Sequence, residues 1–419
     1  MAKSSIIIVG AGPVGLFLAL RLTQLGIRVT VLERDESNPP VPRALGYFGA
    51  AMFALQRAGI WEAVRDSGPT FGDLGWRKLA KDKPDGSKAW GDEIAYWNIA
   101  ATTPYKKGEP GWGMVIMGQD QLRAIMLPRI KESGLADFQW GYGLKSLTQD
   151  ETAVTIQAVN SKDEEKIFTA DFVVAADGGK SQTRKQLGIK LDGFTWPEII
   201  ISSDVRLDLE IPGRTGVNYI IDPVNWGFFC PLEHQRTDGP TLYRVTFPVS
   251  DKEMEPEVFE ATVRAKFDIT VPGPRPLKYE VVRQTPYRVH QRLATTMNVG
   301  RVCLVGDAAH LNAPWGAFGL TTGLLDSESL ADALEYIIKD NKPLSILQTW
   351  SEARRKAFSA VSNPISTANK LRCSNLNPET AAEDDAFLKA IVSNDQEALA
   401  RIAGGFQDWR TNMSELLSY

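Results

Sequence analysis

Few of the side chains that build metal centres and disulfide frameworks occur in this chain of 419 residues. Its cysteines and histidines number three each and lie far apart, at Cys230, Cys303, Cys373, His234, His290 and His310. Such scattered residues fit neither the spacing of metal ligands nor a disulfide framework. Because reduced cysteines are typical of the cell interior, we predict a cytoplasmic protein without a metal site.

The chain also lacks a long hydrophobic run and a strong excess of one charge. No stretch is long enough to cross a membrane, and the apolar start, Ile6–Val9, is too short for a signal peptide. The formal net charge of −4 differs from the basic balance of proteins that bind nucleic acid or anionic membranes. We therefore expect no nucleic-acid partner and no membrane partner. The length of 419 residues is enough for two or three domains, and we expect a monomer or homodimer.

The amino-terminal residues carry the pattern of a nucleotide-binding βαβ unit. The apolar strand Ser5–Val9 runs into the turn Gly10-Ala11-Gly12-Pro13-Val14-Gly15, and leucines at helical spacing and a second strand, Arg28–Leu32, follow. In such a unit the first glycine permits the tight turn, the second lets the backbone approach a pyrophosphate, and the third allows close helix–strand packing. Glu33 ends the second strand and would accept hydrogen bonds from ribose hydroxyls while repelling a 2′-phosphate. The unit therefore predicts an FAD or NAD adenosine rather than NADP.

A second stretch has the form of a ligand site at a strand end. The short apolar run Val302–Val305 ends on Gly306-Asp307, a turn rich in proline and glycine follows, and a helix is predicted after Gly319. Open α/β sheets bind ligands at such strand ends, where a carboxylate can hold sugar or polyol hydroxyls. Glycines at the start of the helix let a flat ring lie against backbone amides.

Together these stretches resemble the FAD-dependent aromatic hydroxylases, the para-hydroxybenzoate hydroxylase-like class A flavoprotein monooxygenases. The residues that match the second flavin-contacting motif of that family are Gly306, Asp307, Ala308, Ala309, His310, Pro314, Gly316, Gly319, Gly323 and Asp326. Three positions depart, because Ala317, Phe318 and Thr321 stand where Gly, Gln and Asn are common. The resemblance continues into the helical run Trp350–Arg355.

The resemblance implies a set of FAD contacts in both stretches and between them. The residues concerned are Gly10, Gly12, Pro13, Val14, Gly15, Glu33, Arg34, Arg43, Gln119, Asp177, Asp307, Pro314, Gly316, Gly319 and Leu320. Three of them have a simpler interpretation: Asp177 in a turn after a core strand, Arg43 as a solvated loop charge, and Gln119 as a helix start without a ligand. Trp315 either contacts the flavin edge or is a core aromatic, and His310 is expected to hold the turn after Asp307.

The resemblance and the strand pattern together predict an α/β fold. It consists of a Rossmann-like FAD-binding domain with an inserted β-sheet substrate domain and a helical C-terminal region. The predicted boundaries are 1–75, 113–185 and 286–345 for the discontinuous FAD-binding domain, 76–112 and 186–285 for the β-rich substrate domain, and 346–419 for the helical region. Within these domains we predict a helix at about Gln119–Glu132 and strands at Ile199–Leu209, Val217–Ile221, Trp226–Pro231 and Leu242–Phe247. Residues 76–112 are rich in aromatic side chains and loop-like.

The activity implied by the resemblance is NAD(P)H-dependent hydroxylation of a phenolic or other electron-rich aromatic molecule by way of a flavin hydroperoxide. NADPH or NADH would be a transient reductant, and dioxygen and a small aromatic substrate would be the other partners. The helix start at Gly319–Thr322 offers amides to the reduced ring. No residue stands out as the base that deprotonates the phenol, and the catalytic candidates are Arg206, Tyr219 and Arg244.

Other functions share the same motifs. Epoxidation, Baeyer–Villiger oxidation and dehydrogenation by an FAD-dependent oxidoreductase stay open, and so does a flavin-binding protein without turnover. Stimulation of NADPH oxidation by phenols, with little release of peroxide, would distinguish hydroxylation from these alternatives.

Overall fold

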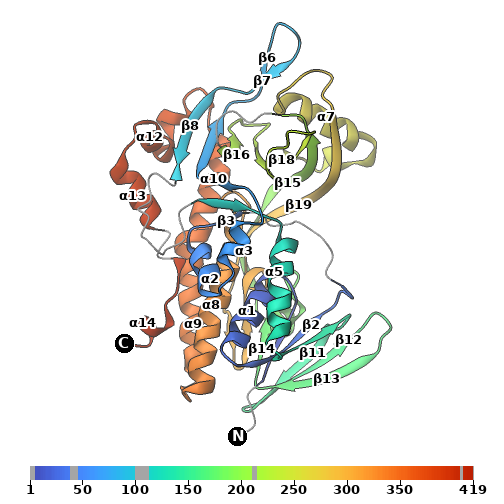
Figure 1. Cartoon of the computed structure of the whole chain (residues 1–419), viewed down its shortest axis with the longest axis vertical. Helices are drawn as coiled ribbons and strands as arrows, with labels where there is room; N and C mark the ends of the chain where they lie inside the picture. Colours follow the sequence, from blue (N-terminus) through green and yellow to red (C-terminus); the bar gives the residue numbers. More distant parts are fainter. Residues whose placement is uncertain (1–4, 38–45, 100–112, 210–214, 406–408, 419) are drawn as a thin grey trace.

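The computed structural model describes residues 5–37, 46–99, 113–209, 215–405 and 409–418. Two large sheets organise these residues, and Figure 1 shows them at opposite ends of the molecule. A six-stranded sheet lies with α1 (Pro13–Gln24) and α5 (Gln119–Glu132) in the lower part of the view, and an eight-stranded sheet lies in the upper part. The long helix α8 (Phe318–Lys339) packs against both α1 and α9 (Ser345–Ala357).

The six-stranded sheet carries the nucleotide-binding turns. Its strands are, in spatial order, β10 (Ala136–Trp140), β2 (Arg28–Glu33), β1 (Ser5–Val9), β14 (Phe172–Ala175), β21 (Val302–Leu304) and β20 (Asn298–Val299). All pairs are parallel except β20 with β21. Along β1, Ile6 and Ile8 belong to the main core with α1, whereas Ile7 and Val9 pack against a three-stranded sheet on the other face. Burial on both faces explains the continuous apolar run of this strand.

The eight-stranded sheet is mainly antiparallel and has two different faces. Its strands are, in spatial order, β22 (His310–Leu311), β19 (Tyr279–Ala294), β15 (Leu191–Leu207), β18 (Thr241–Val249), β17 (Gly227–Pro231), β16 (Thr215–Ile220), β5 (Asp73–Arg77) and β8 (Glu93–Asn98). Helix α7 (Pro256–Thr270) packs on one face, where Val263 and Phe267 share a core with Ile201 and Val205. On β15, the residues that alternate with Ile201 and Val205 point to the opposite face of the sheet.

Smaller elements complete the described fold. The remaining strands are β3 (Gly46–Phe48), β4 (Thr70–Phe71), β6 (Lys81–Asp82), β7 (Lys88–Ala89), β9 (Met114–Ile116), β11 (Gly143–Gln149), β12 (Val154–Val159) and β13 (Glu165–Ala170). The remaining helical segments are α2 (Ala50–Arg57), α3 (Trp61–Arg65), α6 (Gln182–Gln186), η1 (Lys252–Met254), η2 (Gly306–Ala308), η3 (Phe358–Ser362), α10 (Asn363–Asn375), α11 (Ala381–Asp384), α12 (Ala386–Val392), α13 (Gln396–Gly404) and α14 (Met413–Leu416). Figure 1 shows α12 and α13 beside β8.

The predicted fold class is confirmed, and the predicted helix Gln119–Glu132 has the observed bounds of α5. Two elements of the upper part were missed. Helix α7 lies within the stretch expected to be β-rich, and its proline at the first helical position was the available signal. The stretch at 76–112 is not simply loop-like, because β8 adds an edge strand to the eight-stranded sheet. The domain boundaries stay a prediction, and β19 runs across the one placed between residues 285 and 286.

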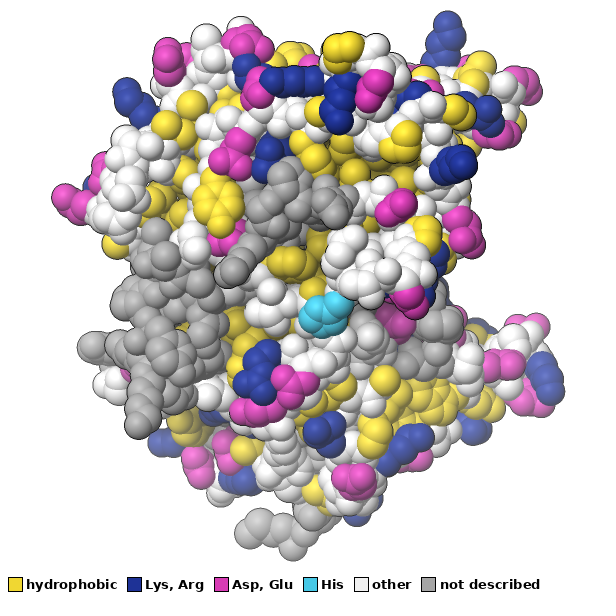
Figure 2. Space-filling view, turned by 45° about the horizontal axis from the view of Figure 1, so that its top comes forward, with side chains coloured by type: hydrophobic (Ala, Val, Ile, Leu, Met, Phe, Trp, Pro, Cys, Tyr) yellow, Lys and Arg dark blue, Asp and Glu magenta, His cyan; other side chains and the backbone are white. Residues whose placement is uncertain are grey.

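The surface carries charges of both signs. Figure 2 shows positive and negative side chains interspersed over the described residues of one face. Among the described residues, no helix is both long and apolar enough to cross a membrane. The three cysteines are free and buried.

Candidate functional site

The amino-terminal glycine turn has the geometry of a nucleotide cradle. Gly10 has a φ of 110°, and a Cβ there would lie 2.4 Å from the Ala176 carbonyl oxygen. A Cβ on Gly15 would lie 2.1 Å from the Gly10 carbonyl oxygen, so only glycine allows α1 to start this close to the strand. At Gly12, by contrast, a Cβ would meet no atom of the described chain within 4 Å. The open position is the N-cap of α1, which has no side-chain cap, so its amides and positive helix end face outward.

Two carboxylates beside this turn are placed by backbone amides. The Ala11 amide donates to Glu33 Oε2 (2.7 Å), which brings the end of β2 to the glycine turn. Asp177 Oδ2 accepts bonds from the amides of Gln182 and Thr183 (2.9 and 3.1 Å) at the start of α6. The other oxygen, Asp177 Oδ1, is buried without a hydrogen-bond partner among the described residues. Asp177 therefore binds the start of α6, a role that neither interpretation of the sequence included, and also presents an acceptor that nothing in the described chain satisfies.

The second turn presents backbone amides at the start of α8. Gly316 has a φ of 110°, and Ala317, the N-cap of α8, adopts the left-handed conformation with a φ of 57°. No side chain caps this helix start. The side chain of Asn312 donates to the Ala313 carbonyl, and its Oδ1 is buried without a hydrogen-bond partner among the described residues. The uncapped helix end fits an anionic or carbonyl-rich ring edge, whereas Asn312 Oδ1 fits a hydrogen-bond donor.

The two turns meet directly although they are far apart in the sequence. Val14 in the first turn of α1 fills the space beside Gly306 and Gly323, where a Cβ would lie 3.1 and 2.6 Å from its methyl groups. Ser327 Oγ on α8 donates to the Val14 carbonyl (3.0 Å). Arg184 donates to the carbonyls of Ala308 and Gly179, and so joins the Asp177 loop to the second turn. One extended ligand can therefore contact both motifs.

A buried ionic network holds the second turn from behind. Asp326 Oδ2 lies 2.6 Å from His310 Nε2 and accepts a bond from the Gly306 amide (3.0 Å), while its Oδ1 accepts a bond from Arg354 Nε (2.8 Å). Burial alone would raise the pKa of Asp326, but the nearby His310 and Arg354 hold it below the usual range of a carboxyl group. The expected role of His310 as a holder of this turn agrees with that contact.

A cavity of about 510 Å³ lies between the second turn and the free face of the eight-stranded sheet. The turn side contributes Asp307, Asn312, Pro314, Gly316, Ala317, Gly319 and Leu320, with Gly46, Met114 and Ile116 next to them. The sheet side contributes Ser202, Asp204, Val217, Tyr219, Phe228, Cys230, Arg244, Arg283, Thr285 and Tyr287. A cavity of this size with apolar walls and a few polar groups is typical of a small-molecule site.

The sheet side is dominated by a buried ion pair. Arg244 binds Asp204 through two bonds, Nε to Oδ1 (2.7 Å) and Nη2 to Oδ2 (2.9 Å), and the two residues face each other across β15 and β18. Burial raises the pKa of Tyr219 and of Tyr287, and it raises the pKa of the Cys230 thiol to about 12. These hydroxyl and thiol groups therefore stay protonated near neutral pH and act as hydrogen-bond donors rather than bases.

The structure brings most of the predicted site residues together around the two turns and the cavity. Tyr219 and Arg244 line the cavity, whereas Arg206 lies outside it and binds Glu233 (3.0 Å) and the Pro240 carbonyl. Arg34 is exposed on the surface, Gln119 is the first residue of α5, and Arg43 lies outside the described residues. Trp315 is fully buried against Trp226 and Phe228, as expected of a core aromatic.

Several cavity residues were missed from the sequence. Asp204, Arg283 and Tyr287 lie on strands whose pairing partners are remote in the chain. The alternation of Ser202, Asp204 and Arg206 along one predicted strand was the available signal, because such residues share a face. It did not reveal that this face lines a cavity, since that depends on where the distant turn packs.

Comparisons with known proteins agree with the geometry. The family described as FAD binding domain matches residues 3–363 of the chain. The chain is 32% identical over 394 residues to para-nitrophenol 4-monooxygenase of Pseudomonas sp. (strain WBC-3), covering 92% of this chain and 91% of that protein. It is 29% identical to 6-hydroxy-3-succinoylpyridine 3-monooxygenase HspB of Pseudomonas putida (strain DSM 28022 / S16), with 88% of each covered. The crystal structure of p-nitrophenol 4-monooxygenase PnpA from Pseudomonas putida DLL-E4 superimposes with a TM-score of 0.85 at 30% identity, covering 98% of this chain and 99% of that one.

Proposed function

This chain belongs to the FAD binding domain family and is an FAD-dependent monooxygenase of the aromatic-hydroxylase type. We propose that it hydroxylates a phenol, which binds as the phenolate in the cavity of about 510 Å³. The observation that carries the proposal is the position of this cavity. One wall is the uncapped start of α8, and the other holds Arg244 with the hydroxyls of the buried Tyr219 and the half-buried Tyr287. When bound, FAD accepts electrons from NADPH or NADH and activates dioxygen.

The chain's own residues would hold FAD along the two turns. The amides at Gly12 and at the start of α1 bind the pyrophosphate, and Glu33 binds the ribose. Asp307 lies at the cavity edge, where a carboxylate binds polyol hydroxyls. The amides after Ala317 would stabilise negative charge on the bound ring, because the positive end of a helix stabilises an anion. Gly10, Pro13, Val14, Gly15, Gln119, Asp177, Pro314, Gly316, Gly319 and Leu320 complete the proposed contacts, and Arg34 and Arg43 stay predictions.

On the sheet side, the residues bind and orient the substrate. The hydroxyls of Tyr219 and Tyr287 donate hydrogen bonds to a phenolate oxygen, because their raised pKa values keep them protonated. The Arg244 guanidinium, fixed in the plane of its bidentate bond to Asp204, adds a positive charge at a defined position. Met114, Ile116, Val217 and Phe228 exclude water from the ring. None of the three donors accepts a proton, so we infer that the substrate is a phenol acidic enough to ionise before it binds.

Para-nitrophenol is the first probe, because it is the substrate named for two of the similar proteins. We expect it to stimulate NAD(P)H oxidation with little hydrogen peroxide, and to give a product with oxygen inserted at a ring carbon. In a series of para-substituted phenols, kcat/KM should follow the fraction present as phenolate. An epoxide, a lactone or a desaturated product would favour the alternative oxidations, and peroxide alone would contradict coupled hydroxylation.

Two tyrosines on β19 offer a matched test of the sheet side. Tyr287→Phe removes a hydroxyl that lines the cavity, whereas Tyr279→Phe removes one from a ring stacked on Phe267 on the other face. Because a hydrogen bond to a charged group contributes about 1.5–3 kcal/mol, Tyr287→Phe should raise KM for para-nitrophenol about tenfold or more. Tyr279→Phe should leave KM unchanged. Equal KM values for the two variants would contradict binding of the phenolate at this wall.

The compartment and the assembly state also belong to the proposal. We propose a cytoplasmic monomer or homodimer, because the three cysteines are free and both charge signs are interspersed on the surface seen in Figure 2. Cell fractionation and the mass of the purified holoprotein in solution test these two points. A particle larger than a dimer would contradict the second.

A further inference from the structure

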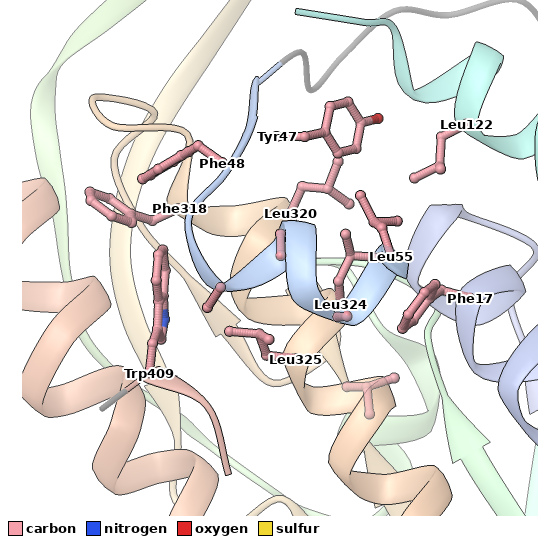
Figure 3. Close-up of a cluster of buried hydrophobic side chains, with 14 of the residues drawn as sticks. Phe17, Tyr47, Phe48, Leu55, Leu122, Phe318, Leu320, Leu324, Leu325 and Trp409 are labelled. Carbon is pink, nitrogen blue, oxygen red and sulfur yellow. The ribbon is translucent and has the colours of Figure 1, made fainter. Parts of the chain in front are cut away.

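The C-terminal segment 409–418 packs onto the start of α8. Trp409 is fully buried, and its ring centroid lies 4.9 Å from that of Phe318 and 6.1 Å from that of Phe48. Figure 3 shows the Trp409 ring reaching toward Phe318 from the C-terminal segment, and Phe48 packs against both rings. Phe318 is the first residue of α8 and follows the cavity residues Gly316 and Ala317 directly. The position of Trp409 therefore bears on the helix start that faces the ring.

A second connection runs through a buried guanidinium. Arg354 Nη1 donates to the Trp409 carbonyl (2.7 Å) and to Thr411 Oγ1 (3.0 Å), while Arg354 Nε donates to Asp326. Asp326 in turn binds the Gly306 amide and His310. Both Arg354 and Asp326 have fully buried side chains. Charged hydrogen bonds in such surroundings are strong and geometrically demanding, and this path connects the C-terminal segment to the turn that carries Asp307.

Beyond Trp409 the segment is held less tightly. A cavity of about 1080 Å³ lies between residues 410–416 and the helices α8 and α9. Glu328, Asp332, Lys356 and Glu415 are among the residues that line it. The segment is attached at Trp409 and Thr411, at Arg410, which pairs with Glu328 (3.5 Å), and at the buried Met413.

We propose that Trp409 is a positioning residue for FAD, through which attachment of the C-terminal segment and FAD binding are coupled. The proposal rests on FAD binding at the two turns, but not on any choice of substrate. Trp409 does not line the cavity, so it acts through Phe318 and Arg354. Since coupling is reciprocal, bound FAD tightens the segment and a well-seated segment tightens FAD.

A pair of conservative variants tests this coupling. Trp409→Phe keeps a ring beside Phe318 but loses the bond from Nε1 to Ser362 Oγ (2.8 Å). The control Trp350→Phe loses an equivalent buried bond, from Nε1 to Ser329 Oγ (3.0 Å), in the middle of the α8–α9 packing. Loss of one such bond lowers the melting temperature of either apoprotein by roughly 1–2 °C. We expect the FAD dissociation constant to rise about three- to tenfold for Trp409→Phe and to stay unchanged for Trp350→Phe. An unchanged constant for the first variant, or an equal rise in both, overturns the proposal.

Two further measurements keep the test decisive if Trp409→Phe folds poorly. Thr411→Val removes only the bond from Arg354 at the edge of the segment, and we expect it to raise the FAD dissociation constant about threefold. In the unaltered protein, saturating FAD should slow hydrogen exchange of the amides at residues 409–413, with residues 386–392 of α12 as the unaffected reference. Equal exchange with and without FAD would overturn the coupling even if the hydroxylase activity is confirmed, and these readouts need no substrate.

Discussion

The two walls of the cavity recognise their ligands in different ways. The turn wall works through the backbone, because Gly316 and Ala317 shape the start of α8 at the cavity. The Gly10–Gly15 turn does not line the cavity, but it works in the same way, because Gly12 leaves the start of α1 open. The sheet wall works through side chains, above all Arg244 and its partner Asp204, from strands that are paired across the sheet. A backbone site suits a cofactor that relatives share, whereas a side-chain site can change its substrate by substitution of single residues. From this difference we expect the turn wall to hold the shared cofactor and the sheet wall to set the choice of substrate.

The strongest test of the sheet wall is removal of the Asp204 carboxylate. Asp204→Ala leaves the buried Arg244 charge without its bidentate partner, and breaking a buried pair from one side costs about 3–5 kcal/mol. We expect a loss of that order in the free energy of unfolding, measured by urea denaturation. The double variant Asp204→Ala/Arg244→Met removes both charges and should recover part of the loss. If the double variant is less stable than Asp204→Ala, the ion pair does not account for the effect.

The backbone turns could be predicted from the sequence more fully than the side-chain wall of the sheet. The Gly10–Gly15 turn was predicted in detail because its function depends on local backbone geometry and on neighbours in the same βαβ unit. Arg244 was named without its partner, and Asp204 was missed, because their contact depends on the register between β15 and β18. The role of Trp409 could not be predicted, since no local pattern relates a tryptophan near the end of the chain to the start of α8.

In the Gly10–Gly15 turn, substitution of two glycines should separate cofactor binding from folding. Gly12→Ala adds a methyl group where the described chain has no atom within 4 Å, so the apoprotein should keep its stability. The methyl would occupy the approach to the pyrophosphate, and we expect the FAD dissociation constant to rise roughly tenfold or more, about 1.4 kcal/mol. Gly15→Ala instead meets the Gly10 carbonyl and should destabilise the apoprotein itself. Fluorescence titration with FAD and thermal unfolding of both apoproteins measure the two effects, and a destabilised Gly12→Ala apoprotein would contradict the separation.

A smaller effect is expected where the turn wall departs from the common family pattern. Ala317 adopts a left-handed φ of 57°, which costs a residue with a Cβ roughly 1 kcal/mol, and its methyl lies 2.8 Å from where a Cβ on Gly46 would be. Ala317→Gly should therefore raise the free energy of unfolding by up to about 1 kcal/mol. Gly46→Ala should lower it by crowding Ala317, and the double variant should restore it. A double-mutant cycle by chemical denaturation measures the coupling, and strictly additive effects would show that the two residues do not compete for this space.

The smallest effect separates two arginines that the sequence alone could not distinguish. Arg206 lies two residues beyond Asp204 on β15, but the register pairs it with Leu242, and its guanidinium turns to Glu233 outside the cavity. Because partly exposed ion pairs contribute about 0.2–1 kcal/mol, Arg206→Met should lower the free energy of unfolding by no more than that and leave KM for para-nitrophenol unchanged. Arg244→Met, on the cavity side of the same sheet, should raise KM. A rise in KM for Arg206→Met comparable to that for Arg244→Met would mean that substrate binding extends beyond the cavity to the end of β15, and that the sheet wall is larger than its lining residues indicate.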